Sequence, residues 1–524
     1  MNHLPASFST ASVLLHLSHR RHTRAMASSD CQLHINSLPD GILQEVFRYL
    51  SLTDRKTAAL VCSLWEQEAF SAGLLANVRL CMTSTCGEAF LEVLRNSWRP
   101  YRNVVVCDMR LCGTVLCEFV MALLDIFGTT IEEFIMKNAC TAAQVKGFAE
   151  RMPNLRKMVI FVRESEKLSV ESLEFPVLRR LHEVGVWIKR DHGVKSCQLD
   201  MLRMAPNVQQ LRMQYRFHDE KMFDLLERCA NQLRSLHLFA YCYPFPIHTL
   251  RFENLLVLKL QGVPQLRNFH RLSHMLRGMR KLKAIHLDYR ISTTTLAVVC
   301  NSCPKLETLD IRADGLEASS FDYLSDTPHL QVFMVQYLHI GLLEQAKPIN
   351  GIKNLHIYVE HKAWRNEAFV DNLSKVFPNV CKMKYIHRQD TVYKDHIGSL
   401  IMHRICSKFT HLTKLTISAE RCQNDFVLSI EPSGLGNVEE LHCVQTSEFR
   451  EPTMENSVKR LIIHNVDPTK LLFSNMTRSF PKLKYLEIRS CAATSSEFIA
   501  EIRRNFPQCI VHCEFMTKLK WKYK

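Results

Sequence analysis

The chain has 524 residues, of which 47% are hydrophobic, and it contains only 16 Gly and 18 Pro. This composition excludes an extensively disordered protein and allows either several ordinary domains or one long repeat array. Lys and Arg outnumber Asp and Glu by 67 to 52, and the formal net charge of +15 favours acidic partners. The most apolar window, 115–131, is interrupted by Glu118 and Asp125, so the sequence predicts a soluble chain without a transmembrane segment.

The first residues differ in composition from the rest of the chain. Residues 1–29 contain no Asp or Glu and include Arg20, Arg21 and Arg24, a profile typical of transit peptides. The alternative is that translation effectively begins at Met26. We predict that residues 1–33 are a disordered or untranslated leader.

The segment 34–80 is predicted to form two short amphipathic helices. Ser37 is a candidate N-cap for the first helix, with Pro39 and Asp40 in its first turn. Apolar residues then recur at steps of three and four, break at 51–53, and continue to Trp65. Two short helices cannot bury so many apolar side chains by themselves, so the pattern predicts a partner surface.

This segment resembles the F-box, the module that docks on the Skp-type adaptor of SCF ubiquitin ligases. The opening Leu-Pro of the family stands at 38–39, and its diagnostic Val-Cys-x-x-Trp stands at 61–65. Gly41 departs from the family, which often has an acidic residue there. The alternative interpretation is the first helical hairpin of a larger core. The resemblance implies adaptor binding by Leu38, Pro39, Ile42, Leu43, Val46, Phe47, Leu50, Val61, Cys62 and Trp65.

From residue 81 to 514 one motif recurs, as in Leu306-Glu-Thr-Leu309-Asp-Ile311. The mean spacing of about 25 residues lies in the range of leucine-rich repeats. The alternating last three positions predict a short strand, and the segments between strands carry helical spacing. A doubly wound α/β domain also alternates strands and helices, but it does not repeat one motif. Sixteen copies begin at positions 104, 131, 155, 181, 208, 233, 255, 282, 306, 330, 352, 380, 412, 438, 458 and 483.

The predicted fold class is therefore α/β, with an N-terminal helical F-box followed by a leucine-rich-repeat solenoid. In such a solenoid a curved parallel sheet lies inside and helices lie outside. The repeats from residue 155 onward also resemble those of F-box proteins, which lack the Asn ladder of the commonest repeat class. This combination implies a non-enzymatic substrate receptor of an SCF ligase, acting in the cytoplasm or nucleus in protein ubiquitination and proteasomal degradation. Its partners would be the Skp-type adaptor, through it cullin and RING protein, and a protein substrate.

The sequence predicts no catalytic, metal or cofactor site. Gly434-Leu-Gly436 lacks the rest of a phosphate-binding loop and is interpreted as a turn. The 24 His residues are dispersed, and the one Cys-x-x-Cys, 300–303, has no second pair at zinc-site spacing. The 20 Cys are interpreted as reduced intracellular thiols. A thioester-forming cysteine stays open, although no local signature marks one.

The predicted target site lies on the concave face, where variable strand positions project in register. An acidic or phosphorylated protein is the favoured partner, and nucleic acid is less favoured because no nucleic-acid module is present. The basic tail 515–524 carries Trp521 and Tyr523, which could stack on bases. The alternative function is an interaction scaffold outside a ligase, including one that binds nucleic acid. Neighbouring repeats or loops could instead cover the predicted target-binding residues, which are Phe161, Trp187, Phe239, His286, Arg312 and Tyr358.

Overall fold

The computed structural model contains two compact units, residues 1–206 and 207–524. The predicted leader, Ser37 and residues 516–524 of the basic tail lie outside the described residues. The structure describes residues 35, 38–83, 86–107, 113–162, 174–188, 202–215, 220–240, 247–262, 269–360, 368–388, 397–420, 429–430, 434–444, 448–449, 456–464, 473–490 and 496–515.

Short helices occupy the start of the first unit: α2 (Asp40–Arg48), α3 (Leu52–Ala58), α4 (Ser63–Ala69) and α5 (Ala72–Leu75). Helix α2 begins at Asp40 and has Pro39 as its N-cap, so the prediction that Ser37 caps this helix is wrong. The second predicted helix is divided into α3 and α4. Ser51 caps α3 by accepting a 3.2 Å hydrogen bond from the Asp54 N–H, which satisfies one of the free donors of its first turn.

The helices share a small core of their own. Leu43, Phe47 and Trp65 are buried, and the rings of Phe47 and Trp65 meet edge to face with centroids 5.5 Å apart. Such a pair adds directional attraction to the burial of apolar area. The spacing of Leu43 and Phe47 by four residues puts both on one face of α2, toward α4.

The rest of the first unit alternates strands and helices. Each strand pairs in parallel with the next, from β1 to β5, among the residues described. The elements are β1 (Arg79–Met82), α6 (Glu88–Arg95), β2 (Asn103–Val106), α7 (Gly113–Phe127), β3 (Glu133–Cys140), α8 (Ala142–Arg151), β4 (Lys157–Val162) and β5 (Glu183–Ile188).

The second unit continues the same architecture over thirteen described strands paired in parallel with their neighbours. These are β6 (Gln210–Tyr215), β7 (Ser235–Ala240), β8 (Val257–Gln261), β9 (Ala284–Arg290), β10 (Thr308–Arg312), β11 (Val332–Gln336), β12 (Asn354–Glu360), β13 (Lys382–Arg388), β14 (Lys414–Glu420), β16 (Glu440–Val444), β18 (Arg460–His464), β19 (Tyr485–Ser490) and β20 (Ile510–Phe515). A separate parallel pair joins β15 (Ser429–Ile430) to β17 (Glu448–Phe449).

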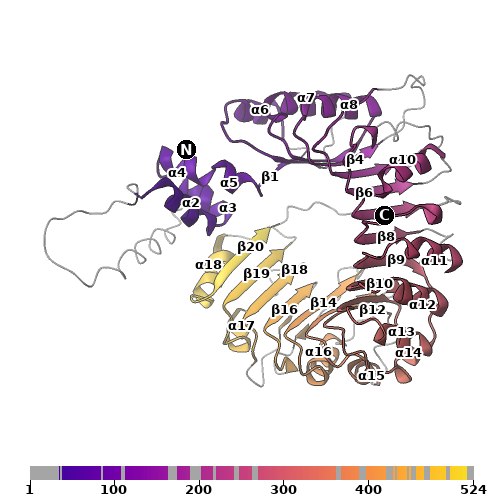
Figure 1. Ribbon diagram of the computed structural model, residues 1–524. Coiled ribbons are helices and arrows are strands. Elements are labelled where there is room, and N and C mark those ends of the chain that lie inside the picture. Colours follow the sequence, from indigo (N-terminus) through magenta and orange to yellow (C-terminus); the bar gives the residue numbers. More distant parts are fainter. Residues whose placement is uncertain are drawn as a thin grey trace. The chain divides into compact units, whose positions relative to one another are not determined.

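Helices of the second unit follow its outer side, and the strands line its inner side (Figure 1). The predicted α/β solenoid is confirmed, and all sixteen predicted repeats coincide with a strand. Strands β1 and β20 are additional units that the motif search missed. The helices are α10 (Glu220–Ala230), α11 (Phe269–Arg277), α12 (Thr293–Ser302), α13 (Asp322–Ser325), α14 (Ile340–Glu344), α15 (Ala368–Val376), α16 (Ile397–Lys408), α17 (Phe473–Ser479) and α18 (Ser496–Asn505), with 3-10 turns η2 (Ile247–Thr249) and η4 (Ala318–Phe321).

Two kinds of contact connect neighbouring repeats of the second unit, one along the strands and one at some of the turns. Along each strand, inward residues point into the core between sheet and helices, and outward residues point to the concave face. The inward residues lie in register, so that Leu309 is flanked by Ile285 and Phe333, and all three are buried. At the turn before the strand, an Asn side chain bonds a carbonyl of the preceding repeat. Asn254 donates to the Asn231 carbonyl at 2.6 Å, and Asn379, Asn437 and, in the first unit, Asn154 make equivalent bonds. These asparagines form a partial ladder that the sequence analysis did not expect.

The burial alternation of β10 predicts opposite outcomes for two neighbouring substitutions. Leu309→Asp should destabilise the second unit by several kcal/mol, because a carboxylate would be buried without a partner. Thr308→Asp, on the outward face of the same strand, should cost less than about 1 kcal/mol. Thermal denaturation followed by circular dichroism measures both. Equal thermal midpoints for the two variants would contradict the assigned register.

Candidate protein-docking surfaces

The helical segment of the first unit exposes large apolar side chains. Ile42 is 51% exposed and Tyr49 is 83% exposed, and their spacing of seven residues places both on one face of α2 and its C-terminal cap. Leu60 is 85% exposed and Val61 is 62% exposed in the turn between α3 and α4. Single exposed apolar side chains are common, but four on so short a segment favour a contact with another protein.

The structure divides the predicted adaptor-binding residues into three groups. Pro39, Ile42 and Val61 are exposed and available for a partner. Leu43, Phe47 and Trp65 are buried among the helices, where they hold the segment together, and their contact with an adaptor stays a prediction. The remaining four are partly exposed at the edge of this core: Leu38, Val46, Leu50 and Cys62.

Sequence reasoning missed Tyr49 and Leu60, the two most exposed large apolar residues of the segment. A signal was available for Leu60. Leu60, Val61 and Cys62 are consecutive apolar residues, and three consecutive positions on helical spacing cannot all face one core. At least one of them therefore had to point outward.

The helical segment is attached to the first repeats by specific contacts. The Arg99 guanidinium lies 3.8 Å above the centre of the Phe70 ring, and its Nη2 is 3.1 Å from Glu66 of α4. Tyr101 packs on the core of the segment and meets the ring of Phe127, in α7, at 5.6 Å. These contacts hold the segment in one orientation on the repeats of the same unit.

Replacing Arg99 with Ala should loosen this attachment, because the ion pair and the cation–π contact are lost together. We expect faster amide hydrogen exchange in α4 and α5, corresponding to about 1 kcal/mol less local stability, with β3 and β4 unchanged. Arg102→Ala is the matched control, since Arg102 pairs with Glu132 among the repeats. Unchanged exchange in α4 for Arg99→Ala would contradict this role.

Two predicted target-binding residues lie on the outward face of the first unit's sheet. Phe161 of β4 and Trp187 of β5 are directly opposite each other in the strand register. Their rings stack with centroids 5.9 Å apart and an interplanar angle of 16°. Both side chains remain partly exposed, so they form an aromatic platform that a partner could contact.

Phe239, in the second unit, is part of a connected group on β7 to β9. Its ring lies 4.1 Å from that of His237, whose Nε2 is 3.3 Å from the Gln261 Oε1. The Gln261 Nε2 in turn donates to Asp288 at 3.2 Å. Burial lowers the pKa of His237 to about 4, so this imidazole is neutral at physiological pH and helps to position the ring of Phe239.

The other three predicted target-binding residues are also partly exposed, and all three lie on strands of the second unit. His286 contacts the Asp310 carboxylate of the next strand. Arg312 lies over the Tyr337 ring at 4.7 Å and forms a 3.3 Å ion pair with Asp314. Tyr358 of β12 is opposite Gln336 of β11 in the strand register. The six predicted residues therefore belong to two different units, with Phe161 and Trp187 in the first.

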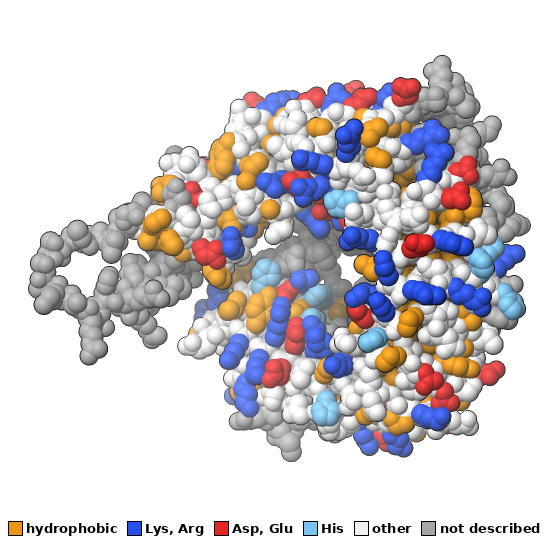
Figure 2. All heavy atoms as spheres, in the orientation of Figure 1, with side chains coloured by type: hydrophobic (Ala, Val, Ile, Leu, Met, Phe, Trp, Pro, Cys, Tyr) orange, Lys and Arg blue, Asp and Glu red, His pale blue; other side chains and the backbone are white. Residues whose placement is uncertain are grey.

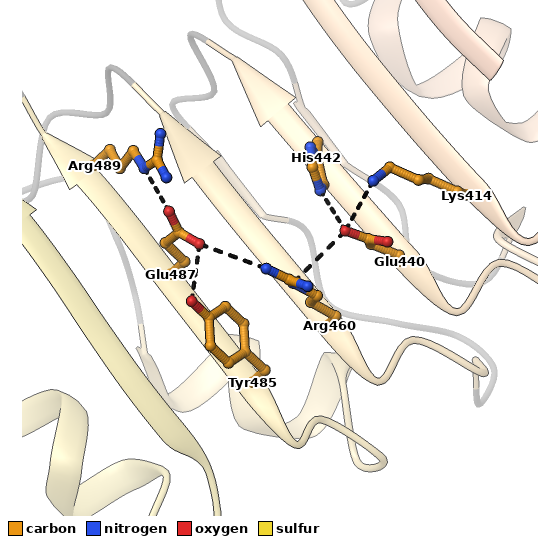
Figure 3. A network of polar contacts seen from close by, with 7 residues as sticks. All are labelled: Lys414, Glu440, His442, Arg460, Tyr485, Glu487 and Arg489. Atoms are coloured by element: carbon orange, nitrogen blue, oxygen red, sulfur yellow. Dashed lines mark hydrogen bonds and ion pairs between the residues drawn. The ribbon is translucent and has the colours of Figure 1, made fainter. Parts of the chain in front are cut away.

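A further polar network on β14, β16, β18 and β19 was not among the predicted sites (Figure 3). Glu440 accepts from Lys414 at 3.1 Å and from His442 at 2.7 Å, and lies 3.6 Å from Arg460. Glu487, on the other side of Arg460, accepts from the Tyr485 hydroxyl at 3.0 Å. Figure 2 shows Lys and Arg side chains interspersed with Asp, Glu and His over these strands.

The described residues contain no group of three or more His, Cys, Asp or Glu side chains that could hold a metal ion. Burial raises the pKa of Cys300 to about 11 and that of Cys303 to about 12, so both thiols are protonated and poor nucleophiles at neutral pH. Gly436, with φ of 52°, lies in the turn predicted at 434–436.

The family comparison concerns the helical segment. The F-box-like family model matches residues 35–79, which cover α2 to α5. This chain contains an F-box-like domain followed by a repeat array. The F-box-like domain ends where β1 begins, and no helix among the residues described is both long and apolar enough to cross a membrane.

Two solved structures are similar to this chain at low identity. The yeast Rad7 and Elc1 complex contains a chain that is 12% identical, with a TM-score of 0.36, covering 68% of this chain and 91% of its own. The TLR13–ssRNA13 complex contains one that is 12% identical, with a TM-score of 0.30, covering 79% and 52%. Both scores are below 0.5, so neither similarity supports a conclusion about this chain. No curated protein matches the chain in sequence.

Proposed function

We propose that this protein is the substrate-recognition subunit of an SCF-type ubiquitin ligase. The F-box-like domain binds the Skp-type adaptor, and through it cullin and the RING protein, in the cytoplasm or nucleus. The solenoid binds the protein to be ubiquitinated and directs it to proteasomal degradation. The observation that carries the proposal is the exposed apolar surface of the F-box-like domain, defined by Pro39, Ile42, Tyr49, Leu60 and Val61.

The energetics of this surface support binding to a partner. Full burial of a Leu or Val side chain contributes about 1.5–3 kcal/mol relative to leaving it exposed. Burial of Leu60 and Val61 together would therefore contribute enough binding free energy to change adaptor affinity by two or more orders of magnitude. The buried Leu43, Phe47 and Trp65 hold the helices so that this surface is formed before binding, which lowers the entropic cost of association.

Function in such a ligase requires binding and placement, and the chemistry is performed by other subunits. Holding a target lysine near a conjugating enzyme converts a bimolecular encounter into a local one. The contacts of Arg99 and Tyr101 support this role, because a receptor that positions its target needs a fixed connection between the adaptor-binding domain and the repeats that follow it. The outward strand residues, with Phe161 and Trp187 stacked among them, are available for the target.

An interaction scaffold that acts outside a ligase is the second candidate. The net charge of +15 favours it, because a basic surface attracts acidic partners and nucleic acid whether or not an adaptor is bound. The two candidates differ in one measurable property. Only the ligase subunit should co-purify with the Skp-type adaptor and cullin.

Leu60→Asp combined with Val61→Asp should reduce affinity for the Skp-type adaptor by about a hundredfold or more, because two buried apolar contacts become buried charges. Both positions are exposed, so the fold should be retained. Val93→Asp combined with Ile510→Asp, at two equally exposed apolar positions outside the F-box-like domain, is the control and should bind normally. Calorimetry with the purified adaptor measures the affinities. Undiminished binding by the first variant, or no binding by the unaltered chain, would refute the assignment.

A further inference from the structure

The concave face of the second unit carries an excess of positive charge between β13 and β19. The carboxylates whose side chains are described on the outward positions of these strands are Glu440 and Glu487, and at the far end of β14 Glu420 is opposite Arg388 of β13 in the register. Glu440 and Glu487 are engaged by the cations around them. Five cations project from the same face: Lys382, Lys384, Lys414, Arg460 and Arg489.

Three of these cations are lysines at adjacent positions with too few carboxylates to neutralise them. Lys382 and Lys414 are directly opposite each other in the register of β13 and β14, and Lys384 is the next outward residue of β13. Lys414 forms an ion pair with Glu440 at 3.1 Å. Lys382 and Lys384 have no acidic partner among the residues described. Like charges opposite each other on neighbouring strands are destabilising, so this arrangement does not serve the stability of the sheet.

The two arginines are held in fixed positions by a buried acid. Glu487 is only 3% exposed, and its carboxylate contacts the Arg489 Nε and lies 4.0 Å from the Arg460 Nη2 (Figure 3). Burial by itself would raise the pKa of Glu487, but the hydrogen bond from Tyr485 and the charge of Arg489 outweigh it, and the pKa falls below its usual value. The acid is therefore ionised and anchors both guanidinium groups.

Both guanidinium groups are partly exposed on the concave face. The Arg460 side chain is 47% exposed and that of Arg489 is 42% exposed. Arg460 also lies over the Tyr485 ring at 4.5 Å, and its contacts to Glu440 and Glu487 use Nε and Nη2. A guanidinium that is already oriented loses less entropy on binding an anion than a mobile one, and its fork of donors matches phosphate oxygens.

We propose that this basic surface, Lys382, Lys384, Lys414, Arg460 and Arg489, binds a phosphorylated side chain within an acidic segment of the protein to be ubiquitinated. The proposal rests on the function proposed above and specifies the chemistry of its target. A phosphate dianion fits the two anchored guanidiniums, and Lys382 and Lys384, which lie beyond Lys414 on β13, add positive charge that no described carboxylate pairs with. Glu440 and Glu487 disfavour a nucleic-acid backbone, because a continuous row of phosphates would meet these carboxylates as well as the cations.

The test uses the full-length chain and degenerate peptide libraries of acidic composition with a central phosphoserine. Matched libraries carry serine or glutamate at the centre. We expect retention of the phosphoserine library about tenfold above the other two, because charge-assisted hydrogen bonds to the dianion are gained. Lys382→Gln combined with Lys384→Gln should remove most of this difference. That variant leaves no buried charge unpaired, so its fold should be retained.

Arg460→Gln combined with Arg489→Gln should abolish the difference, and thermal denaturation of the variant reports whether Glu487 tolerates the loss of its partners. Arg503→Gln combined with Arg504→Gln, on the exposed side of α18, makes the same change in net charge and should have no effect. Equal retention of all three libraries, or no retention, would overturn the proposal. So would displacement of the phosphopeptides by single-stranded RNA at lower concentration, which would indicate a nucleic-acid site. Retention of phosphopeptides by a chain that fails to bind the Skp-type adaptor would refute the ligase function and support this site.

Discussion

The contact between apolar strand residues of neighbouring repeats is the interaction on which the rest of the structure depends. A single repeat, with one short strand and one helix, cannot bury its own apolar side chains. In register with its neighbours it can, as the buried row through Ile285, Leu309 and Phe333 shows. The asparagines of the turns extend this order to the backbone, because each joins its turn to a carbonyl of the preceding repeat. Inward positions are therefore constrained in size and polarity, whereas outward positions are free to serve a partner.

This division explains why polar networks gather on the outward face. The parallel register places outward residues of adjacent strands opposite each other, and short networks form wherever acids and bases coincide, as between His286 and Asp310. It also places Lys382 against Lys414, a pairing that weakens the sheet. Lys414 is paired with Glu440, which leaves Lys382 as the charge that the proposed acidic target would neutralise.

The F-box-like domain differs from the repeats, whose apolar strand residues are buried by their neighbours. Its few helices cannot cover all of their apolar side chains. Leu43, Phe47 and Trp65 fill the small core, and Leu60 and Val61 remain outside it. The attachment through Arg99 and Tyr101 then gives this surface a defined relation to the first repeats. Adaptor docking and target binding can thus be separate properties of separate surfaces in one chain.

The sequence by itself determined the repeat, the α/β class and the helical F-box segment. Apolar spacing reports directly which residues must be buried, and each predicted copy, such as that of Leu306 to Ile311, coincides with a strand. It did not determine which apolar residues of the F-box segment face outward, because Phe47 and Leu60 look alike in a hydrophobic pattern and differ only in what packs against them.

The tertiary structure also decided how the charged residues combine. Lys414, Glu440, Arg460 and Glu487 are separated by twenty or more residues from one strand to the next, and no local pattern links them. Only the parallel register brings them together, because it places equivalent positions of successive repeats side by side. The termini of the array were missed for a related reason: β1 and β20 each have repeats on one side only, so their sequences are under weaker constraint.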